Sequence, residues 1–327
     1  MGTKDRVLEL LEQRRGQSVS GESMAEALDI SRNAVWKAIQ ELRKEGFRIM
    51  AANRKGYCLS EENDILSLQA IRPYLSEGSL RYADQVKIFP SLASTNQTAK
   101  EMAVAGAPHG TVVIADVQTA GHGRYARPFF SPAGSGLYIS LILRPEALQL
   151  KNPTLITAFA AVAVCEAIEA VSDQKARIKW VNDILIQGKK VSGILTEAAT
   201  GFESGELGWI VLGIGINVST APGDFPAGLR ELATSIFPER PQPGIRSRLA
   251  AGLINRIVGQ AEFPREQDIL KAYKSRLMML GREVTVFQSE GSYPATALDI
   301  DSLGRLIVQR PTGETQTLSA GEIHIRV

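Results

Sequence analysis

A glycine- and arginine-rich segment in the middle of the chain has the composition of an anion-binding loop. It covers residues 121–127, with the sequence GHGRYAR, and further glycines follow at Gly134 and Gly136. Glycine lets the backbone bend and approach a ligand closely, and guanidinium groups bind phosphate or carboxylate through paired hydrogen bonds. The Gly-Lys-Ser/Thr ending of a Walker loop is missing, and the helix that a dinucleotide fingerprint requires does not follow. Taken alone, the segment is better interpreted as a flexible hairpin loop with solvated arginines.

Four further polar segments accompany this loop. Residues 94–97, with the sequence STNQ, open a predicted helix and have the spacing of a capping box. Gln118 lies three residues ahead of the loop, residues 179–183 (KWVND) precede a predicted hairpin that carries Lys190, and residues 213–217 (GIGIN) end a predicted strand. Lysines that flank a buried hairpin need an anionic partner, so the two lysines of this set indicate a bound anion.

In this order and spacing the five segments resemble the biotin–protein ligase family. Together with the N-terminal segment and the tail described below, they resemble the bifunctional ligase–repressors of the BirA family along nearly the whole chain. The resemblance implies a two-step, ATP-dependent reaction. Biotin carboxylate attacks the α-phosphorus of ATP, giving biotinyl-5′-adenylate and pyrophosphate. A lysine of a biotin carboxyl carrier protein, such as that of acetyl-CoA carboxylase, then attacks the adenylate. Magnesium would arrive with the nucleotide, and the adenylate would act as corepressor by favouring a homodimer on operator DNA.

The resemblance also implies roles for individual residues. The catalytic charges are expected on Lys179, Lys190, Arg124 and Arg127. The residues expected to bind biotin, ATP or the adenylate are Ser94, Thr95, Asn96, Gln118, Gly121, His122, Gly123, Arg124, Phe129, Lys190, Gly213, Gly215 and Asn217.

Three positions depart from the usual family pattern. Phe129 stands where the family often has a tryptophan that stacks on adenine. His122 replaces the first arginine of the usual Gly-Arg-Gly-Arg, and Val181 replaces a proline. Two alternatives therefore stay open: a lipoate–protein ligase, which shares the catalytic architecture, and a non-catalytic transcription factor that only senses biotin. His122 is the feature that favours the second alternative.

The N-terminal segment has the pattern of a winged helix-turn-helix. Residues 22–28 form one predicted helix, residues 29–31 the turn, and Ser31 is suited to cap a second helix that starts at Arg32. Residues 48–59 continue as a predicted hairpin, the wing. Residues 1–60 contain 11 Lys or Arg and 8 Asp or Glu, a net +3. The side chains expected to contact DNA are Ser31, Arg32, Asn33, Lys37, Arg54 and Lys55.

So few phosphate contacts predict weak binding by one copy, which favours a dimer that reads two half-sites. The alternative is a winged-helix interaction domain that does not bind DNA.

The rest of the chain predicts an α+β multidomain protein. Strands are expected at 112–115, 137–141, 184–186, 191–195 and 209–218, and helices at 94–105, 154–171, 245–262 and 265–279. Tail strands at 284–287, 293–300, 305–309 and 314–318 predict a small SH3-like β-barrel. We therefore expect a DNA-binding domain over 1–65, a mixed-sheet α/β ligase domain over 66–276 and a barrel domain over 277–327, with residues 61–64 as the linker.

The bulk composition narrows the class of protein. The 327 residues suggest two or three domains, and the formal net charge of +2 means that DNA affinity must come from a local patch. The N-terminus lacks the apolar region of a secretory signal, and no window is apolar enough for a membrane helix. Two distant cysteines and three scattered histidines predict neither a disulfide framework nor a protein-built metal site. These features predict a cytoplasmic protein that does not bind a membrane.

Overall fold

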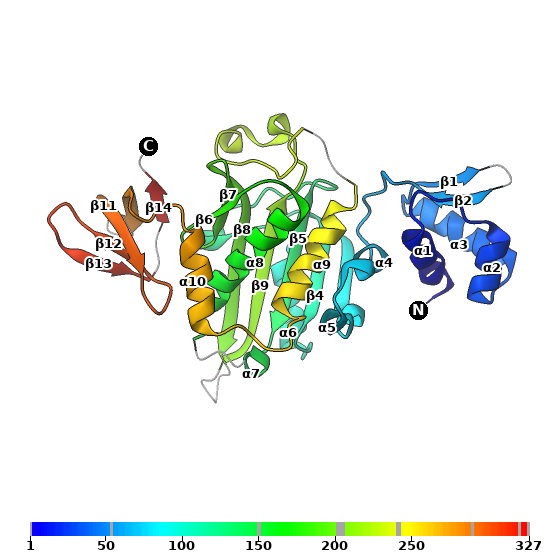
Figure 1. The fold of residues 1–327 in the computed structure, drawn as a ribbon, viewed down its shortest axis with the longest axis horizontal. Helices are drawn as coiled ribbons and strands as arrows, with labels where there is room; N and C mark the ends of the chain where they lie inside the picture. The colour runs from blue at the N-terminus through cyan, green and yellow to red at the C-terminus, as the bar shows by residue number, and fades with distance from the viewer. Residues whose placement is uncertain are drawn as a thin grey trace.

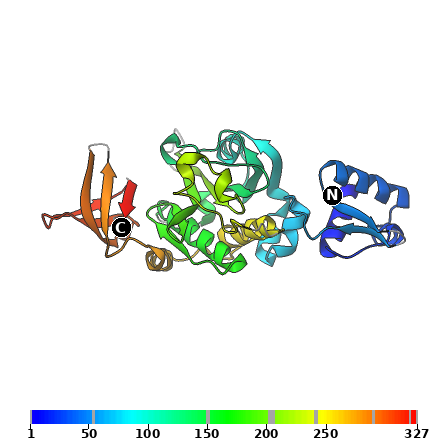
Figure 2. The same cartoon turned by 90° about the horizontal axis from the view of Figure 1, so that it is seen from above.

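Three bodies follow one another along the long axis of the computed structural model: N-terminal helices, a central sheet covered by helices, and a C-terminal sheet (Figure 1). Figure 2 shows the same row from above. The structure describes residues 2–52, 55–148, 152–200, 207–239, 243–288, 291–319 and 322–325.

The N-terminal body contains α1 (Thr3–Gln13), α2 (Gly21–Leu28), α3 (Arg32–Lys44) and the antiparallel pair β1 (Ile49–Ala52) and β2 (Gly56–Leu59). Its core is a separate apolar cluster that joins all three helices through side chains such as Leu11, Met24 and Ile39. Ser31 caps α3, because its Oγ accepts a hydrogen bond from Ala34 N at 3.1 Å. The predicted helix-turn-helix and its hairpin are confirmed.

The predicted linker is held more firmly than its polar sequence suggests. Asn63 is buried, and its side-chain oxygen accepts a hydrogen bond from Arg48 N at 3.1 Å. Arg15 Nη1 donates to the backbone oxygen of Asn63 at 2.6 Å. The chain then enters two short helices, α4 (Leu68–Ile71) and α5 (Glu77–Leu80).

The central body is built on a seven-stranded sheet in the order β3-β4-β5-β9-β8-β7-β6. β3 and β4 are parallel and the other neighbours are antiparallel, so the predicted mixed sheet is confirmed. The strands are β3 (Val86–Leu92), β4 (Thr111–Gln118), β5 (Gly136–Leu143), β6 (Ala176–Lys179), β7 (Asp183–Ile186), β8 (Lys189–Thr200) and β9 (Leu207–Asn217). The sequence analysis did not predict β3 and β6, which form the two edges of the sheet. Edge strands bury less apolar surface, and these two carry residues such as Pro90 and Arg177.

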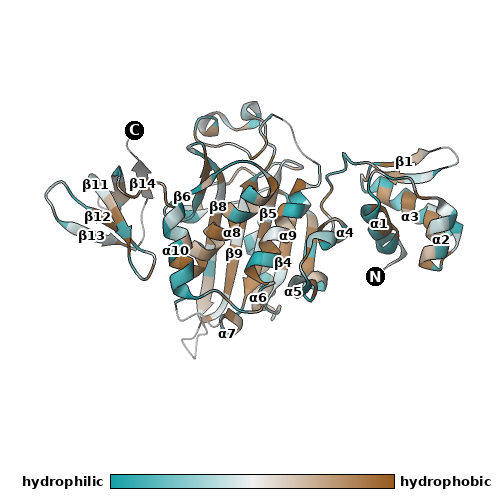
Figure 3. Ribbon diagram, in the orientation of Figure 1, coloured by the Kyte–Doolittle hydropathy of each residue, from teal (hydrophilic) through white to brown (hydrophobic). Residues whose placement is uncertain are grey.

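Helices cover both faces of this sheet, because successive side chains of a strand point to opposite faces and both sets are apolar. Val113 packs with Ala99 and Ala103 of α6 (Thr95–Val104), whereas its neighbours Val112 and Ile114 belong to the main core. That core contains residues of α8 (Leu155–Val171), α9 (Ile245–Ile257) and α10 (Glu266–Arg276), and α7 (Pro145–Leu148) contributes Leu148. Apolar residues dominate the central strands in Figure 3. No helix in the described ranges has the length and apolar character that a membrane span requires.

Two of the predicted helices are too long at their C-terminal ends. The predicted helix 245–262 ends at Ile257, where Val258 leaves the helical conformation with φ −122°. The predicted helix 265–279 ends at Arg276, because Leu277 is already extended.

The C-terminal body is an antiparallel sheet in the order β13-β12-β11-β10-β14. Its strands are β10 (Glu283–Gln288), β11 (Gly291–Ile300), β12 (Leu306–Gln309), β13 (Thr315–Leu318) and β14 (Glu322–Ile325). The described residues pair these strands as an open sheet, with β13 and β14 at its edges. Its buried side chains, including Val284 and Leu306, continue the core of the central body.

Candidate functional site

A cavity on the α6 face of the central sheet collects most of the predicted ligand-binding residues. The start of α6, the end of β4, the glycine-rich loop and the 179–183 segment form its walls, and β8 and β9 form its floor. The predicted residues that line it are Ser94, Thr95, Asn96, Gln118, His122, Gly123, Arg124, Arg127, Phe129, Lys179, Lys190, Gly213 and Gly215.

Two predicted residues lie outside the lining of this cavity. Asn217 is buried, and its Nδ2 donates to the backbone oxygen of Thr234 at 3.1 Å, so it holds the chain that follows β9. A Cβ at Gly121 would lie 2.8 Å from Gln118 Nε2, so this glycine leaves room for a side chain that does line the cavity.

The floor of the cavity is bare backbone. Gly193 and Gly215 are paired across β8 and β9, and Gly213 lies on the same face. A Cβ at Gly213 would come within 1.9 Å of Asn96 Oδ1, and one at Gly215 within 2.5 Å of the Phe129 ring. The glycines are therefore required for side chains to pack directly on the sheet.

One wall is a network of buried polar groups. Gln118 Oε1 accepts hydrogen bonds from Thr95 N at 2.8 Å and Thr95 Oγ1 at 3.1 Å. Ser140 Oγ lies 2.8 Å from Thr95 Oγ1 and donates to Asn96 Oδ1 at 2.6 Å. Ser94 caps α6 by accepting from Gln97 N at 3.4 Å. These bonds fix hydroxyl and amide groups that can recognise a small polar ring.

Glu197 supports this wall and was missed by the sequence analysis. Its carboxylate accepts hydrogen bonds from Asn96 Nδ2 at 2.9 Å and from Lys100 Nζ at 2.8 Å. Burial raises the pKa of Glu197, but the bonds from Lys100 and Asn96 and the charges of Lys100 and His122 hold it below its usual range. Strand alternation was the available signal, since Glu197 lies four residues after Gly193 on the same face of β8.

The opposite wall carries the cationic side chains. Lys190 Nζ lies 2.5 Å from Asp183 Oδ1. The anionic partner that the sequence analysis assigned to a bound ligand is thus, for Lys190, a carboxylate of the protein itself. Arg124 Nη1 donates to Asn182 Oδ1 at 3.4 Å, and Asn182 Nδ2 donates to the backbone of β8 at 2.7 Å. Lys179 and Arg127 line the same cavity. No cluster of three His, Cys, Asp or Glu side chains suited to a metal occurs among the described residues.

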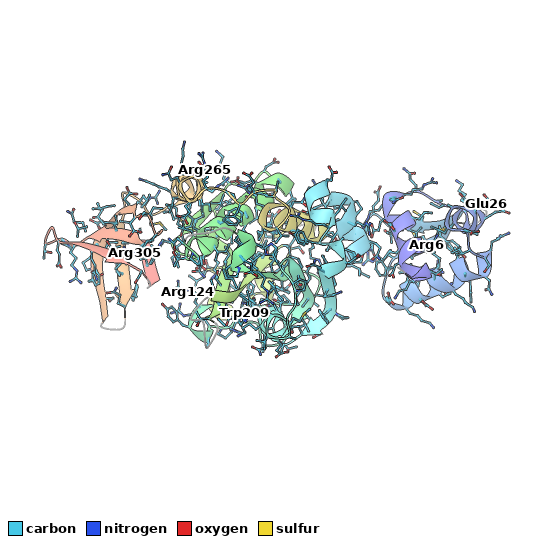
Figure 4. All side chains as sticks on the ribbon, turned by 90° about the horizontal axis from the view of Figure 1, so that it is seen from below. Arg6, Glu26, Arg124, Trp209, Arg265 and Arg305 are labelled. Carbon is cyan, nitrogen blue, oxygen red and sulfur yellow. The ribbon has the colours of Figure 1, made fainter. Side chains whose placement is uncertain are left out.

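Arg124 faces the C-terminal sheet as well as the cavity. In Figure 4 it lies on the side of the central body nearer to Arg305. Both residues line a second cavity, together with Trp180. Trp180 is itself buried, and its Nε1 donates to Gly304 O at 3.1 Å.

The backbone strain in the loop falls on residues other than its glycines. Tyr125 and Ala126 have φ values of 57° and 54°, in the left-handed region, whereas Gly123 has φ −108°. Gly123 N donates to Arg127 O at 2.8 Å, which closes this turn. The expectation that glycines supply the bend is thus wrong at Gly123. Non-glycine residues in this region persist only where the surroundings enforce them, often at ligand sites.

The N-terminal body presents a second candidate surface on α3. Ser31, Arg32, Asn33 and Lys37 are exposed, and within the described chain Arg32 and Lys37 have no ion-pair partner. Lys55 is exposed at the wing, whereas the predicted contact Arg54 lies outside the described residues.

Trp36 lies among these residues with 51% of its surface exposed, and the sequence analysis missed it. A tryptophan within an amphipathic helix suggests core packing. The signal was helical spacing. The buried residues Val35, Ala38, Ile39 and Leu42 recur every three or four residues along one face, and Trp36 falls one position outside that series.

Comparisons with known proteins agree with this geometry. Residues 88–217 match the model of the Biotin/lipoate A/B protein ligase family. Residues 3–58 match an HTH domain, and residues 279–326 match the Biotin protein ligase C terminal domain.

Known relatives match this chain over 78% of its length or more. The bifunctional ligase/repressor BirA of Bacillus subtilis is 38% identical over 96% of each chain, and that of Escherichia coli is 31% identical over 95% of this chain and 94% of its own. A biotin–[acetyl-CoA-carboxylase] ligase of Mycobacterium tuberculosis is 30% identical over 78% and 98%, respectively. Among solved structures, the biotin protein ligase of Aquifex aeolicus in complex with biotin and ATP has a TM-score of 0.58 and 25% identity, covering 74% of this chain and 98% of that one.

Proposed function

The chain belongs to the BirA family of bifunctional ligase/repressors, and from this premise we propose that it attaches biotin to carrier proteins and represses transcription. It is an ATP-dependent biotin–[acetyl-CoA-carboxylase] ligase with a DNA-binding helix-turn-helix. The observation that carries this function is a single cavity with an uncharged polar wall at Thr95, Asn96 and Gln118 and cations on the opposite wall.

This polarity matches the two ends of biotin. Its ureido ring offers hydrogen-bond donors and an acceptor to the Thr95–Gln118 wall, and its carboxylate reaches toward Lys190. ATP brings a second anion to the same place. Two anions repel each other, so their reaction depends on positioning and on fixed positive charge. Lys179, Lys190, Arg124 and Arg127 supply that charge.

In the first step a carboxylate oxygen of biotin forms a bond to the α-phosphorus, and the bond to the β-phosphate oxygen breaks. Pyrophosphate leaves with the electron pair. Lys190 and the arginines of the loop bind the carboxylate and the phosphate oxygens, and Phe129 packs beside Gly215 where an adenine ring can stack. The loop closes over the product and excludes water, which protects the adenylate from hydrolysis.

In the second step the amine of an acceptor lysine attacks the acyl carbon of the adenylate. An amide forms, AMP leaves, and the amine releases a proton. The acceptor is the biotin carboxyl carrier protein of acetyl-CoA carboxylase or a related carboxylase. Neither step needs a covalent enzyme intermediate, in agreement with a cavity wall built from amides, hydroxyls and cations.

The cavity suits a magnesium ion that arrives with the nucleotide. Among the described residues, Asp183 is the one carboxylate in its lining, and Lys190 already holds it. Magnesium at nucleotide sites takes most of its ligands from phosphates and water, with one or two from carboxylates. When bound, the ion would neutralise phosphate charge.

Incubation with biotin, labelled ATP and a carrier domain tests the ligase proposal. We expect labelled adenylate first and biotinylated carrier afterwards. Activity with lipoate instead of biotin would indicate a lipoate–protein ligase. Binding of biotin without either product would indicate a transcription factor that only senses it.

The exposed face of α3 supports the proposed contact with operator DNA. An α-helix fits the major groove, where arginine and asparagine side chains read base edges and apolar groups contact the thymine methyl. Arg32, Asn33, Trp36 and Lys37 combine these chemistries on a single face. We add Trp36 to the predicted contacts, as the residue that packs against a thymine methyl.

Replacing Trp36 with alanine is expected to weaken operator binding about tenfold, because loss of recognition at one base pair typically costs about 1–3 kcal/mol. The probe is a duplex selected from randomised DNA in the presence of biotin and ATP. Tyr74→Ala is the matched control, since Tyr74 is an aromatic residue that is 49% exposed on the central body. Equal affinity of Trp36→Ala and the control would exclude Trp36 from the interface.

We also propose a domain organisation, an oligomeric state and a cellular location. The domain borders are 1–65, 66–276 and 277–327, supported by the separate apolar core of the N-terminal body. We also propose an SH3-like barrel for the C-terminal strands, whose described residues pair as an open sheet. The adenylate-bound protein is a homodimer that reads two half-sites, because one copy offers few phosphate contacts. The protein acts in the cytoplasm, where ATP, carrier proteins and DNA are available.

A further inference from the structure

A buried arginine joins the N-terminal body to the catalytic sheet. Arg246 lies near the start of α9 and is only 3% exposed. Its Nε donates to Asp64 Oδ2 at 2.8 Å, and its Nη2 donates to the backbone oxygen of Asp64. Its Nη1 donates to Asp116 Oδ1 on β4 at 2.5 Å and lies 3.5 Å from Gly136 O at the start of β5. The guanidinium therefore holds three separate segments at once.

The charge of this cluster keeps it together. Burial disfavours a charged guanidinium, but Asp64 and Asp116 outweigh that effect and raise the pKa of Arg246. Loss of both carboxylates would leave a buried charge uncompensated and strongly destabilise the protein, whereas loss of one leaves Arg246 paired with the other. Arg246 is therefore expected to stay bound to both carboxylates while the protein is folded.

On one side, the cluster is fixed to the helix-turn-helix. Asp64 follows Asn63, which receives hydrogen bonds from Arg15 of the turn after α1 and from Arg48 beside the wing. Gly244 N also donates to Asp64 Oδ1 at 2.8 Å. A movement of the N-terminal body would therefore displace Asp64.

On the other side, the cluster reaches the ligand cavity. Asp116 lies two residues before Gln118, and its Oδ1 is 3.3 Å from Gly134 N. Gln118 is bonded to Ser131 twice, through its backbone N at 3.2 Å and its Nε2 at 3.0 Å. Residues 131–136, the exit of the glycine-rich loop, are therefore bonded both to a cavity residue and to the Arg246 cluster.

We propose that Arg246 is a positioning residue that couples occupancy of the cavity to the placement of the helix-turn-helix. Closure of the loop on its ligand fixes residues 131–136, which fixes Asp116 and Gly136 against Arg246. Arg246 in turn holds Asp64 and the segment that carries the DNA-binding body. This inference rests on the proposed function, because it names the route by which the adenylate acts on DNA binding.

Hydrogen exchange on the full-length protein, with and without biotin and ATP, tests the coupling through Asp64→Asn. In the wild type we expect the ligands to slow amide exchange at least fivefold both in residues 121–136 and in residues 60–67. In Asp64→Asn the first effect should remain and the second should disappear, with adenylate formation within twofold of the wild type. Glu166→Gln is the matched control. It breaks another ion pair of α9, the one between Arg256 of α9 and Glu166 of α8 at 2.8 Å, and should behave as the wild type.

The outcomes separate the coupling from the ligase proposal. Absence of protection in residues 121–136 of the wild type would contradict the proposed function and, with it, this inference. Protection of 121–136 without protection of 60–67 in the wild type would overturn the coupling alone. Protection of 60–67 in Asp64→Asn equal to that of the wild type would overturn it too, as would equal loss in Glu166→Gln. A purely structural role would raise basal exchange in Asp64→Asn without removing the ligand-dependent difference.

Discussion

Replacing Lys190 with alanine is expected to reduce the affinity for biotin and for the adenylate by roughly 10- to 150-fold. The Lys190 side chain is 37% exposed at the cavity wall and is already oriented by Asp183. A hydrogen bond to a charged group contributes about 1.5–3 kcal/mol, and both the biotin carboxylate and the adenylate phosphate lose such a partner. Calorimetric titration with biotin measures the loss.

Lys189→Ala is the control for this prediction. Lys189 is the adjacent residue in the same hairpin, is 43% exposed and lies 3.4 Å from Glu231, but does not line the cavity. Its replacement should leave the biotin affinity within twofold. An unchanged affinity in Lys190→Ala would remove Lys190 from the site.

Replacing Gly213 with alanine is expected to lower the affinity for biotin by roughly 10- to 100-fold, although only one methyl group is added. The new Cβ would lie 1.9 Å from Asn96 Oδ1. Asn96 cannot move away cheaply, because Ser140, Glu197 and the Leu195 carbonyl hold its buried amide. Displacement leaves buried polar groups without partners, at about 1–3 kcal/mol each.

Gly208→Ala separates the cavity effect from a general effect on β9. Gly208 lies in the same strand, but its added Cβ would make only an ordinary contact, 3.6 Å from Ala199 O. Biotin titration and thermal unfolding of both variants should show a binding defect in Gly213→Ala alone. Equal biotin affinities would show that the bare floor has no part in ligand binding.

The sequence predicted the interior of the fold better than its edges. β4, β5 and β9 are continuous apolar runs because both of their faces are covered, and such runs are visible without a structure. β3 and β6 mix polar residues and proline with apolar ones because each forms an edge. Helix ends were overestimated because local pattern does not show where tertiary contacts stop a helix.

The part of the candidate site that lies in sequence motifs could be predicted. The resemblance named most of the functional side chains that line the cavity, together with Gly121 and Asn217, which do not line it. The supporting partners of the cavity residues lie far away in sequence. Ser140 and Glu197 belong to strands that meet α6 only through the sheet order, and Arg246 joins residues 64 and 116 across three elements. Such contacts depend on topology, which spacing along the chain does not provide.

The central claim is that one protein makes its own corepressor, and DNA binding after catalysis tests it most directly. Fluorescence anisotropy of a labelled duplex, selected from randomised DNA with biotin and ATP present, reports the affinity. With both ligands we expect an affinity at least tenfold higher than with biotin or ATP alone, because only the pair yields the adenylate. Adding a biotin acceptor domain in molar excess over the biotin should then release the DNA, because all of the biotin is transferred and no adenylate can be made again. Equal affinity with biotin alone, or binding that persists after the acceptor is added, would contradict the account.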